Sequence, residues 1–273
     1  MLGEASPLAR ILDRRQSQDN MTGIEVAPLG QDEVHVRIAS LDRRQSELRF
    51  FESILAEDEI NRANRFRFHK DRERFVAGRG LLRGILSPYL GLPANEIIFT
   101  YGSHGKPGIR RQEGRPAIQF NLAHSAGTAI YAIIRDRPVG IDIELVNHEF
   151  PIESVAERFF SKVEVAAFRS LPKDMQSVAF FKCWTRKEAF IKALGDGLSC
   201  PLSDFDVSLK PGEPARLLHV KWASEEASRW CMEDIDCIAG CAAAIVFSGP
   251  QCRMHVSPWD TKQWERNELG SIA

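Results

Sequence analysis

The stretch AIQFNLAHSAGTAIYAIIRDRPVGIDIELV, residues 117–146, decides the fold class. It holds three apolar runs, at 117–123, 128–135 and 139–146, and only short polar turns separate them. Runs of strand length joined by short turns predict an antiparallel meander. The third run also opens a second series of elements, because helical patterns follow it.

Helices are predicted on both sides of this meander. Upstream, we expect a strand at 33–40, helices at 47–68 and 72–90, and a short strand at 96–100. Downstream, we expect helices at 152–170 and 174–194, and strands at 205–209, 215–220, 229–235 and 241–247. Each half runs from a strand through helices to a group of strands, which predicts an α+β fold of two similar halves.

This order of elements divides the chain into four parts. We expect a flexible tail at 1–20, an N-terminal half at 21–138, a C-terminal half at 139–250 and a C-terminal tail at 251–273. The last segment is polar with two tryptophans, and the sequence leaves open whether it docks on the fold.

The composition is that of a soluble globular protein. Of 273 residues, 44% are hydrophobic and 27% are charged, and 36 basic residues oppose 37 acidic ones. A net charge of −1 argues against nucleic acid as the partner. The sequence has no apolar run of the roughly 18 residues that a membrane span needs, and its N-terminus lacks the apolar core of a signal peptide. We therefore expect a cytoplasmic protein with no membrane partner.

The cysteines and most histidines are expected to be structural. None of the six cysteines forms a CxxC pair, so buried reduced thiols are expected rather than disulfides or a zinc site. Histidines 35, 69, 104, 148, 219 and 255 show no metal-ligand spacing along the sequence.

One face of the strand at 139–146 carries two carboxylates. Gly140, Asp142 and Glu144 share this face because side chains alternate along a strand. Like charges about 6.5 to 7 Å apart raise each other's pKa unless a cation lies between them. A hard ion such as Mg²⁺ suits oxygen ligands, although a solvated strand face explains the same pattern.

The helical stretch FFKCWTRKEAFIKALGDG, residues 180–197, places two charges beside its apolar side. Glu188 falls inside the apolar stripe, and Lys192 follows it one turn later. An i,i+4 ion pair is one interpretation. The other is that both residues line a cleft, with Glu188 as metal ligand or base and Lys192 as phosphate ligand. Arg186 and Lys187 are expected to point into solvent.

Local positive charge predicts a phosphorylated ligand. Residues 61–83 contain eight Lys or Arg and two acids, and we expect one or two of these cations to bind phosphate. Lys106, in a Gly-Lys-Pro turn, is either a phosphate ligand or an exposed turn residue. His124, in FNLAHSAG, is either a phosphate donor or a turn histidine. A Ser–His hydrolase is not favoured, because adjacent residues rarely form such a pair and no GxSxG is present.

Taken in order, these motifs resemble the Sfp-type 4′-phosphopantetheinyl transferases. The resemblance rests on GKP, FNLAHS, VGIDIE, RFFSKVE at 158–164 and FFKCWTRKEAFIKALGDGL, and spans roughly Phe50 to Phe247. It implies two similar α+β halves related by a pseudo-twofold axis, with the active site in the cleft between them. It also implies transfer of the phosphopantetheine arm of coenzyme A to a serine of an acyl or peptidyl carrier protein, with release of adenosine 3′,5′-bisphosphate.

The resemblance assigns roles to individual residues. Those matched to the family's motifs are Asp142, Glu144 and Glu188 as Mg²⁺ ligands, Glu188 also as base, Lys192 as pyrophosphate ligand, and Lys106, His124, Arg74 and, more weakly, Arg79 as coenzyme A ligands. One position departs from the family, which usually has Ser where this chain has Ala123. That departure predicts the loss of one polar contact to coenzyme A.

The implied chemistry is physically sensible. Mg²⁺ would neutralise charge on the pyrophosphate, and Lys192 would stabilise the leaving phosphate. The alternatives are a Mg²⁺-dependent phosphodiesterase and a non-catalytic module that binds coenzyme A or a carrier protein. We expect a monomer, since two halves in one chain can complete one site. The carrier protein and its pathway are left open.

Overall fold

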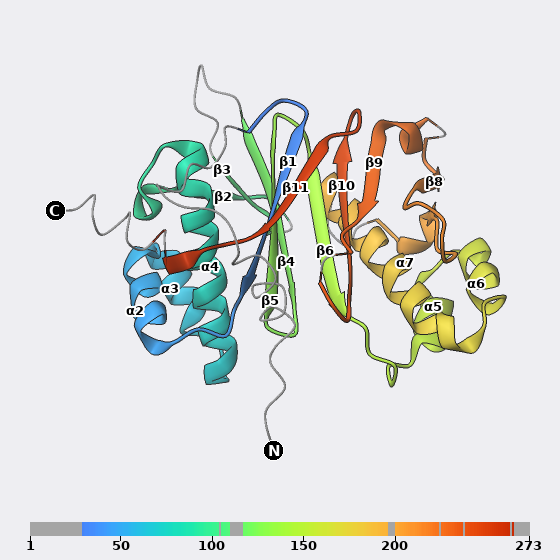
Figure 1. Ribbon diagram of the computed structural model, residues 1–273, viewed down its shortest axis with the longest axis horizontal. Coiled ribbons are helices and arrows are strands. Elements are labelled where there is room, and N and C mark those ends of the chain that lie inside the picture. The colour runs from blue at the N-terminus through green and yellow to red at the C-terminus, as the bar shows by residue number, and fades with distance from the viewer. Residues whose placement is uncertain are drawn as a thin grey trace, which may run out of the picture.

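The computed structural model describes residues 29–103, 105–109, 117–195, 200–223, 225–236, 238–262 and 264. Two β-sheets lie face to face, and each carries helices on its outer side (Figure 1). The layers therefore run helices, sheet, sheet, helices. The tail predicted at 1–20 lies outside the described residues.

The first half begins with a strand and continues through three helices to a meander. Its elements are β1 (Glu33–Ser40), α2 (Gln45–Ile54), α3 (Glu57–Ala63), α4 (His69–Leu90), the short 3₁₀ turn η1 (Ala94–Glu96), β2 (Phe99–Tyr101), β3 (Pro107–Ile109), β4 (Ile118–Ser125) and β5 (Thr128–Arg135). The sequence predicted one helix over 47–68. The backbone of Leu55 and Ala56 is extended instead, so that stretch forms two helices.

The second half repeats this order. Its elements are β6 (Val139–Leu145), α5 (Ile152–Phe159), α6 (Lys162–Arg169), α7 (Lys173–Leu194), η3 (Leu202–Asp204), β7 (Phe205–Val207), β8 (Leu217–Val220), η4 (Glu226–Arg229), β9 (Trp230–Asp234) and β10 (Cys241–Ser248). A last strand, β11 (Arg253–Pro258), returns to the first half. None of the helices in the described part of the chain is long and apolar enough to cross a membrane.

Apart from β11, the two sheets have equivalent topology. The first has the strand order β11-β1-β5-β4 and the second the order β6-β10-β9. In both, the first strand of the half pairs antiparallel with the last strand of its meander, β1 with β5 and β6 with β10. A two-stranded hairpin, β2–β3 or β7–β8, accompanies each. The predicted α+β fold of two similar halves is confirmed.

The inner faces of the sheets form a shared apolar core. Val36 and Ile134 from the first sheet and Ile141 and Ile245 from the second are fully buried there. Burial of such aliphatic side chains is the main force that holds the halves together. The alternation predicted for residues 139–146 is therefore correct over Val139, Ile141 and Ile143, which enter this core, whereas Leu145 at the end of β6 is exposed. Gly140 and Asp142 lie on the opposite face, toward α7.

The segment after residue 250 docks on the fold through strand pairing. Strand β11 lies parallel to β1, with His35 opposite His255. Trp259 and Trp264 follow the strand and are buried against the first helical layer. On β1, burial lowers the pKa of His35 to about 4, so its imidazole is neutral at pH 7.

The expectation that Arg186 and Lys187 point into solvent is wrong. Both side chains are almost fully buried. The guanidinium of Arg186 binds Asp234 of β9, and the ammonium of Lys187 lies 2.8 Å from Oε2 of Glu164. The error arose because α7 is enclosed on more than one side, by its own sheet and by α5, α6 and the β7–β8 hairpin, so that its polar side is also covered.

Candidate active site

A pocket of about 570 Å³ lies between the two halves and brings together six of the eight predicted site residues. We call it the inter-half pocket. The six residues are Arg74 and Arg79 from α4, Lys106 before β3, His124 from β4, and Glu188 and Lys192 from α7. The other two predicted residues, Asp142 and Glu144, lie on β6 next to this pocket, as their contacts show.

Gly140 allows α7 to approach β6 closely enough to build this wall. A Cβ atom at position 140 would lie 2.0 Å from the carbonyl oxygen of Ala189 and 2.4 Å from the amide of Ala193. Only glycine fits at such a backbone contact. Glu188 and Lys192 of α7 are thereby set beside the polar face of β6.

Asp142 and Lys192 form the central ion pair of the site. The ammonium of Lys192 lies 2.6 Å from Oδ1 of Asp142 and also contacts the carbonyl of Ile141. Burial raises the pKa of Asp142 to about 7, with further raising by Glu144 and Glu188, although Lys192 opposes this. Among the described residues, Oδ2 of Asp142 finds no hydrogen-bond partner and is buried.

The two other carboxylates are held differently. Oε2 of Glu144 accepts a hydrogen bond of 2.9 Å from the hydroxyl of Ser125, which also accepts the amide proton of Leu145. Burial raises the pKa of Glu188, and the charge of Glu144 adds to the effect. Glu144 and Glu188 therefore both raise the pKa of Asp142, and Glu144 also raises the pKa of Glu188. Such mutual effects are expected of carboxylates that lie close together.

Asp142, Glu144 and Glu188 offer the type of ligand atom that Mg²⁺ prefers, although they do not form a complete coordination shell. All the donors are carboxylate oxygens, and the buried, unpartnered Oδ2 of Asp142 is an available ligand atom. In the described part of the chain, the oxygen atoms of these three carboxylates do not all lie within 4.8 Å of one another. Mg²⁺ commonly takes one or two carboxylates together with waters and substrate phosphates, so this looser spacing suits it.

The two arginines of α4 that line the inter-half pocket differ in how firmly they are held. Arg74 makes a two-point contact with Asp42, at 2.8 and 3.0 Å, beside the β4–β5 turn. Arg79 is buried against Glu59 at 2.5 Å and lies over the ring of Phe99. Arg74 is therefore the more available of the two for a ligand.

Lys106 and His124 complete the basic lining. The ammonium of Lys106 donates to the carbonyls of Val139 and Lys192, and burial lowers its pKa to about 8. It thus binds the last turn of α7 to the first half. Desolvation and the charge of Lys192 lower the pKa of His124, which favours its neutral form.

Comparison with known proteins decides the family. The sequence profile of the 4′-phosphopantetheinyl transferase superfamily matches residues 138–246, and that of the N-terminal part of a 4′-phosphopantetheinyl transferase matches residues 42–134. The chain is 38% identical over 233 residues to the 4′-phosphopantetheinyl transferase HetI of Nostoc sp. (strain PCC 7120), covering 85% of this chain and 92% of that protein. This protein belongs to the 4′-phosphopantetheinyl transferase family.

Other transferases of the family match over shorter stretches. The enzyme Sfp of Bacillus subtilis is 36% identical over 60% of this chain and 71% of its own length. The enzyme psf-1 of Bacillus pumilus is 42% identical over 57% of this chain and 64% of its own length. A solved holo-[acyl-carrier-protein] synthase of Thermotoga maritima is 26% identical and covers 42% of this chain and 64% of that one, with a TM-score of 0.33.

Two residues that support this transferase's site, Ser125 and Asn121, were not predicted from the sequence as site residues. Ser125 holds Glu144, and the side chain of Asn121 accepts the amide proton of Ile141, which joins β4 to β6. Both belong to the quoted FNLAHSAG segment, but their partners could not be read from it. Ala123 is buried in the core between the sheets and does not line the inter-half pocket. The predicted loss of a polar contact to coenzyme A at this position therefore has no counterpart in the pocket.

Proposed function

We propose that this protein transfers the 4′-phosphopantetheine arm of coenzyme A to a serine of an acyl, peptidyl or polyketide carrier protein, with Mg²⁺ as cofactor. The observation that carries the proposal is the inter-half pocket. Two arginines of α4, Lys106 before β3 and His124 of β4 line one side of it, and Glu188 and Lys192 line the other, next to the buried Asp142. Family membership supports the same activity.

The basic side of the pocket suits a phosphorylated nucleotide. Arg74 is proposed to bind the 3′-phosphate of coenzyme A, because its guanidinium is open to the pocket and fixed in orientation by Asp42. His124 and Lys106 are proposed to contact the remaining phosphates. Arg79 is more deeply buried and serves chiefly to position this wall through Glu59 and Tyr101.

The acidic side of the pocket is proposed to hold the metal. Asp142, Glu144 and Glu188 are its ligands, and a Mg²⁺ ion bound there would neutralise charge on the pyrophosphate oxygens. Lys192 favours the ionised form of Asp142, against the larger effect of burial, and places a positive charge beside the pyrophosphate.

The transfer step needs one base. The serine oxygen attacks the phosphorus that carries the pantetheine arm, the bond from that phosphorus to the bridging oxygen breaks, and adenosine 3′,5′-bisphosphate leaves with the electron pair. The serine proton goes to a carboxylate. Glu188 is the proposed acceptor because its carboxylate faces the pocket beside the proposed metal site, where the attacking serine would lie.

Intact-mass analysis of carrier proteins tests this function. Several apo carriers are incubated with the enzyme and coenzyme A, with Mg²⁺ or with EDTA. We expect a gain of one phosphopantetheine arm on at least one carrier, only with Mg²⁺. Free phosphopantetheine without a mass gain would favour a phosphodiesterase. Coenzyme A binding that is indifferent to Mg²⁺ and yields no product would favour a binding module.

The working unit is proposed to be a monomer in the cytoplasm. Both halves of one chain line the inter-half pocket, so no second copy is needed to complete it. Cys183, Cys231, Cys241 and Cys252 are free thiols, which agrees with a reducing compartment. Sedimentation of the purified protein tests the first of these points.

A further inference from the structure

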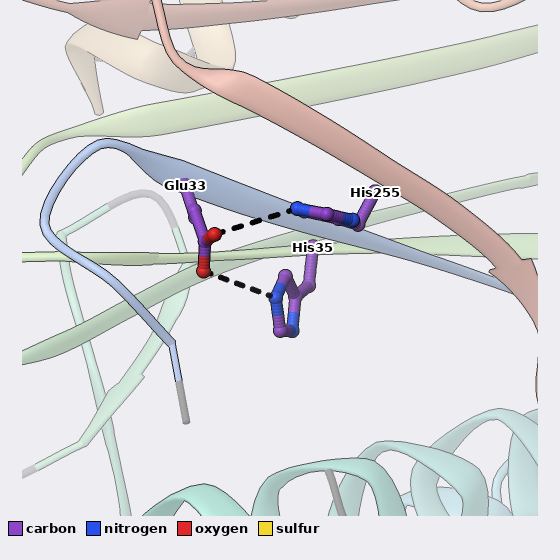
Figure 2. A group of neighbouring side chains, drawn as sticks. All are labelled: Glu33, His35 and His255. Carbon is purple, nitrogen blue, oxygen red and sulfur yellow. Dashed lines mark ion pairs between the residues drawn. The ribbon is translucent and has the colours of Figure 1, made fainter. Parts of the chain in front are cut away.

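A second group of ligand-type side chains lies on the first sheet, on strands β1 and β11. Glu33, His35 and His255 place one oxygen and two ring nitrogens within 4.8 Å of one another (Figure 2). We call this group the β1–β11 triad. Glu33 and His35 share a face of β1, and His255 stands opposite His35 in the parallel register. The proposed magnesium site lies on β6 and α7, so the triad is separate from it.

The spacing within the triad fits a metal ion better than direct hydrogen bonds. Nε2 of His35 lies 4.0 Å from Oε2 of Glu33, and Nε2 of His255 lies 3.5 Å from Oε1. The first distance is beyond a hydrogen bond. Two ligand atoms on one tetrahedral zinc ion lie about 3.3 Å apart, given bonds of about 2.0 to 2.1 Å. Small side-chain movements would close the triad around such an ion.

The surroundings of His35 resemble the support that metal-binding histidines usually have. Its side chain is 3% exposed, and its Nδ1 lies 2.7 Å from the hydroxyl oxygen of Tyr89 on α4. In the tautomer that carries the proton on Nδ1, that oxygen accepts the proton and the Nε2 lone pair is directed toward Glu33; the guanidinium of Arg37, 3.3 Å from Nδ1, can donate only to the other tautomer. In metal-binding histidines, a hydrogen bond from the ring nitrogen that does not bind the metal fixes the orientation and the tautomer of the ring.

The charges around the triad limit which type of metal ion can bind there. Arg37 lies 3.3 Å from Nδ1 of His35 and 3.1 Å from Tyr89, and Arg253 lies 3.6 Å from Oε1 of Glu33. Two nearby guanidinium groups disfavour a weakly bound cation. Two imidazole nitrogens and one carboxylate favour zinc and its neighbours in the first transition series over Mg²⁺ and Ca²⁺, which prefer oxygen ligands.

We propose that Glu33, His35 and His255 form a binding site for a divalent transition-metal ion of the zinc type. The three protein ligands leave a fourth position for water. The bound ion joins β11 to β1, and it therefore fastens the C-terminal strand to the first strand of the fold. His255 is 46% exposed, so the ion has a route of entry from solvent.

Zinc and cobalt titrations of the metal-free, untagged protein test the site. Both are done in excess Mg²⁺, so that sites built from oxygen ligands alone are already filled. Calorimetry with Zn²⁺ is expected to show one saturable equivalent. Co²⁺ is expected to give the strong visible absorption of a four-coordinate site with nitrogen ligands, and the melting temperature is expected to rise with Zn²⁺.

Two conservative variants and one matched control identify the ligands. Glu33→Gln and His255→Gln each remove one ligand from a partly exposed position, so folding is not at stake. We expect each to weaken the zinc equivalent by more than about 100-fold, beyond what changes around a ligand usually cause. His219→Gln is the control, because His219 is also a half-exposed strand histidine facing a carboxylate, at 3.5 Å from Asp206.

Three results would overturn the site. The first is no saturable zinc equivalent in the unaltered protein. The second is an equivalent that both Glu33→Gln and His255→Gln leave intact. The third is a loss of the same size in His219→Gln, which would mean that the ion binds histidines without a defined site.

Discussion

The ammonium of Lys192 lies 2.6 Å from a carboxylate oxygen of Asp142, and this contact joins α7 to β6 beside the inter-half pocket. The pair is asymmetric, because Asp142 is buried while 30% of the Lys192 side chain is exposed. Lys192 thus reaches both the buried carboxylate and the space proposed for the substrate pyrophosphate.

Replacing Lys192 by methionine tests this double role. We expect Lys192→Met to lower the transfer rate by about 100-fold or more, because it removes a positive charge aimed at the leaving group. Its fold should persist, since the side chain is partly exposed. Lys182→Met is the control, because Lys182 lies on the same helix and pairs with Asp234 at 2.9 Å. Equal turnover of the two variants, measured by carrier mass, would remove Lys192 from the chemistry.

Gly140 should tolerate no side chain. We expect Gly140→Ala to lower the free energy of unfolding by about 1 to 3 kcal/mol or more, because its Cβ would meet the backbone of α7. In Gly78→Ala, the new Cβ meets only Leu41, at 3.6 Å, and replacing a helical glycine should add about 0.5 to 1 kcal/mol. Urea unfolding measures both, and equal stabilities would contradict the close contact.

The raised pKa of Asp142 predicts a pH dependence of stability without metal. The folded protein keeps the Asp142 proton up to about pH 7, whereas an ordinary aspartate loses it near 3.8. Because the folded state then binds more protons than the unfolded state, Asp142 makes the protein less stable as pH rises from about 4 to 7.

Asp142→Asn should abolish this contribution. In EDTA, the stability of the variant relative to the unaltered protein should increase between pH 5 and pH 8. Urea unfolding at both pH values measures the difference. A difference that does not change with pH would show that Asp142 titrates normally.

Sequence and structure agree most closely where periodicity decides the outcome. The alternation of residues 139–146 correctly predicted that Ile141 and Asp142 lie on opposite faces of the strand. Ile141 lies in the core, and the face of Asp142 is covered by α7, which the alternation alone did not predict. The same reasoning failed for Lys187, because a helical wheel identifies the polar side of a helix but not whether another element covers it.

Lys187 therefore provides a test of the buried pair that the sequence missed. Its ammonium also donates to the carbonyls of Leu202 and Phe205, so Lys187→Met leaves both carbonyls without this donor and removes the positive charge that pairs with the buried Glu164. We expect a loss of about 3 to 5 kcal/mol in the free energy of unfolding. Lys173→Met, which breaks only an exposed pair with Glu153, should cost about 0 to 1 kcal/mol. A small loss in Lys187→Met would mean that Glu164 is readily neutralised.

Contacts between distant segments account for the rest of what the sequence could not predict. His255 stands opposite His35 only because β11 returns to β1 across 220 positions, and no local spacing records that pairing. Likewise, the contact between Ser125 and Glu144 depends on how β4 meets β6. The polar motifs could be found by their residue types, but their partners depended on the fold.

Transfer by Glu188→Gln tests the central claim most directly. The variant, the unaltered enzyme and the control Glu153→Gln, at an exposed position on α5, are each given coenzyme A, Mg²⁺ and an apo carrier protein that the unaltered enzyme loads. The account predicts that the control loads the carrier normally, while Glu188→Gln binds coenzyme A but adds no phosphopantetheine mass. Loading by Glu188→Gln at a rate close to that of the unaltered enzyme would contradict it.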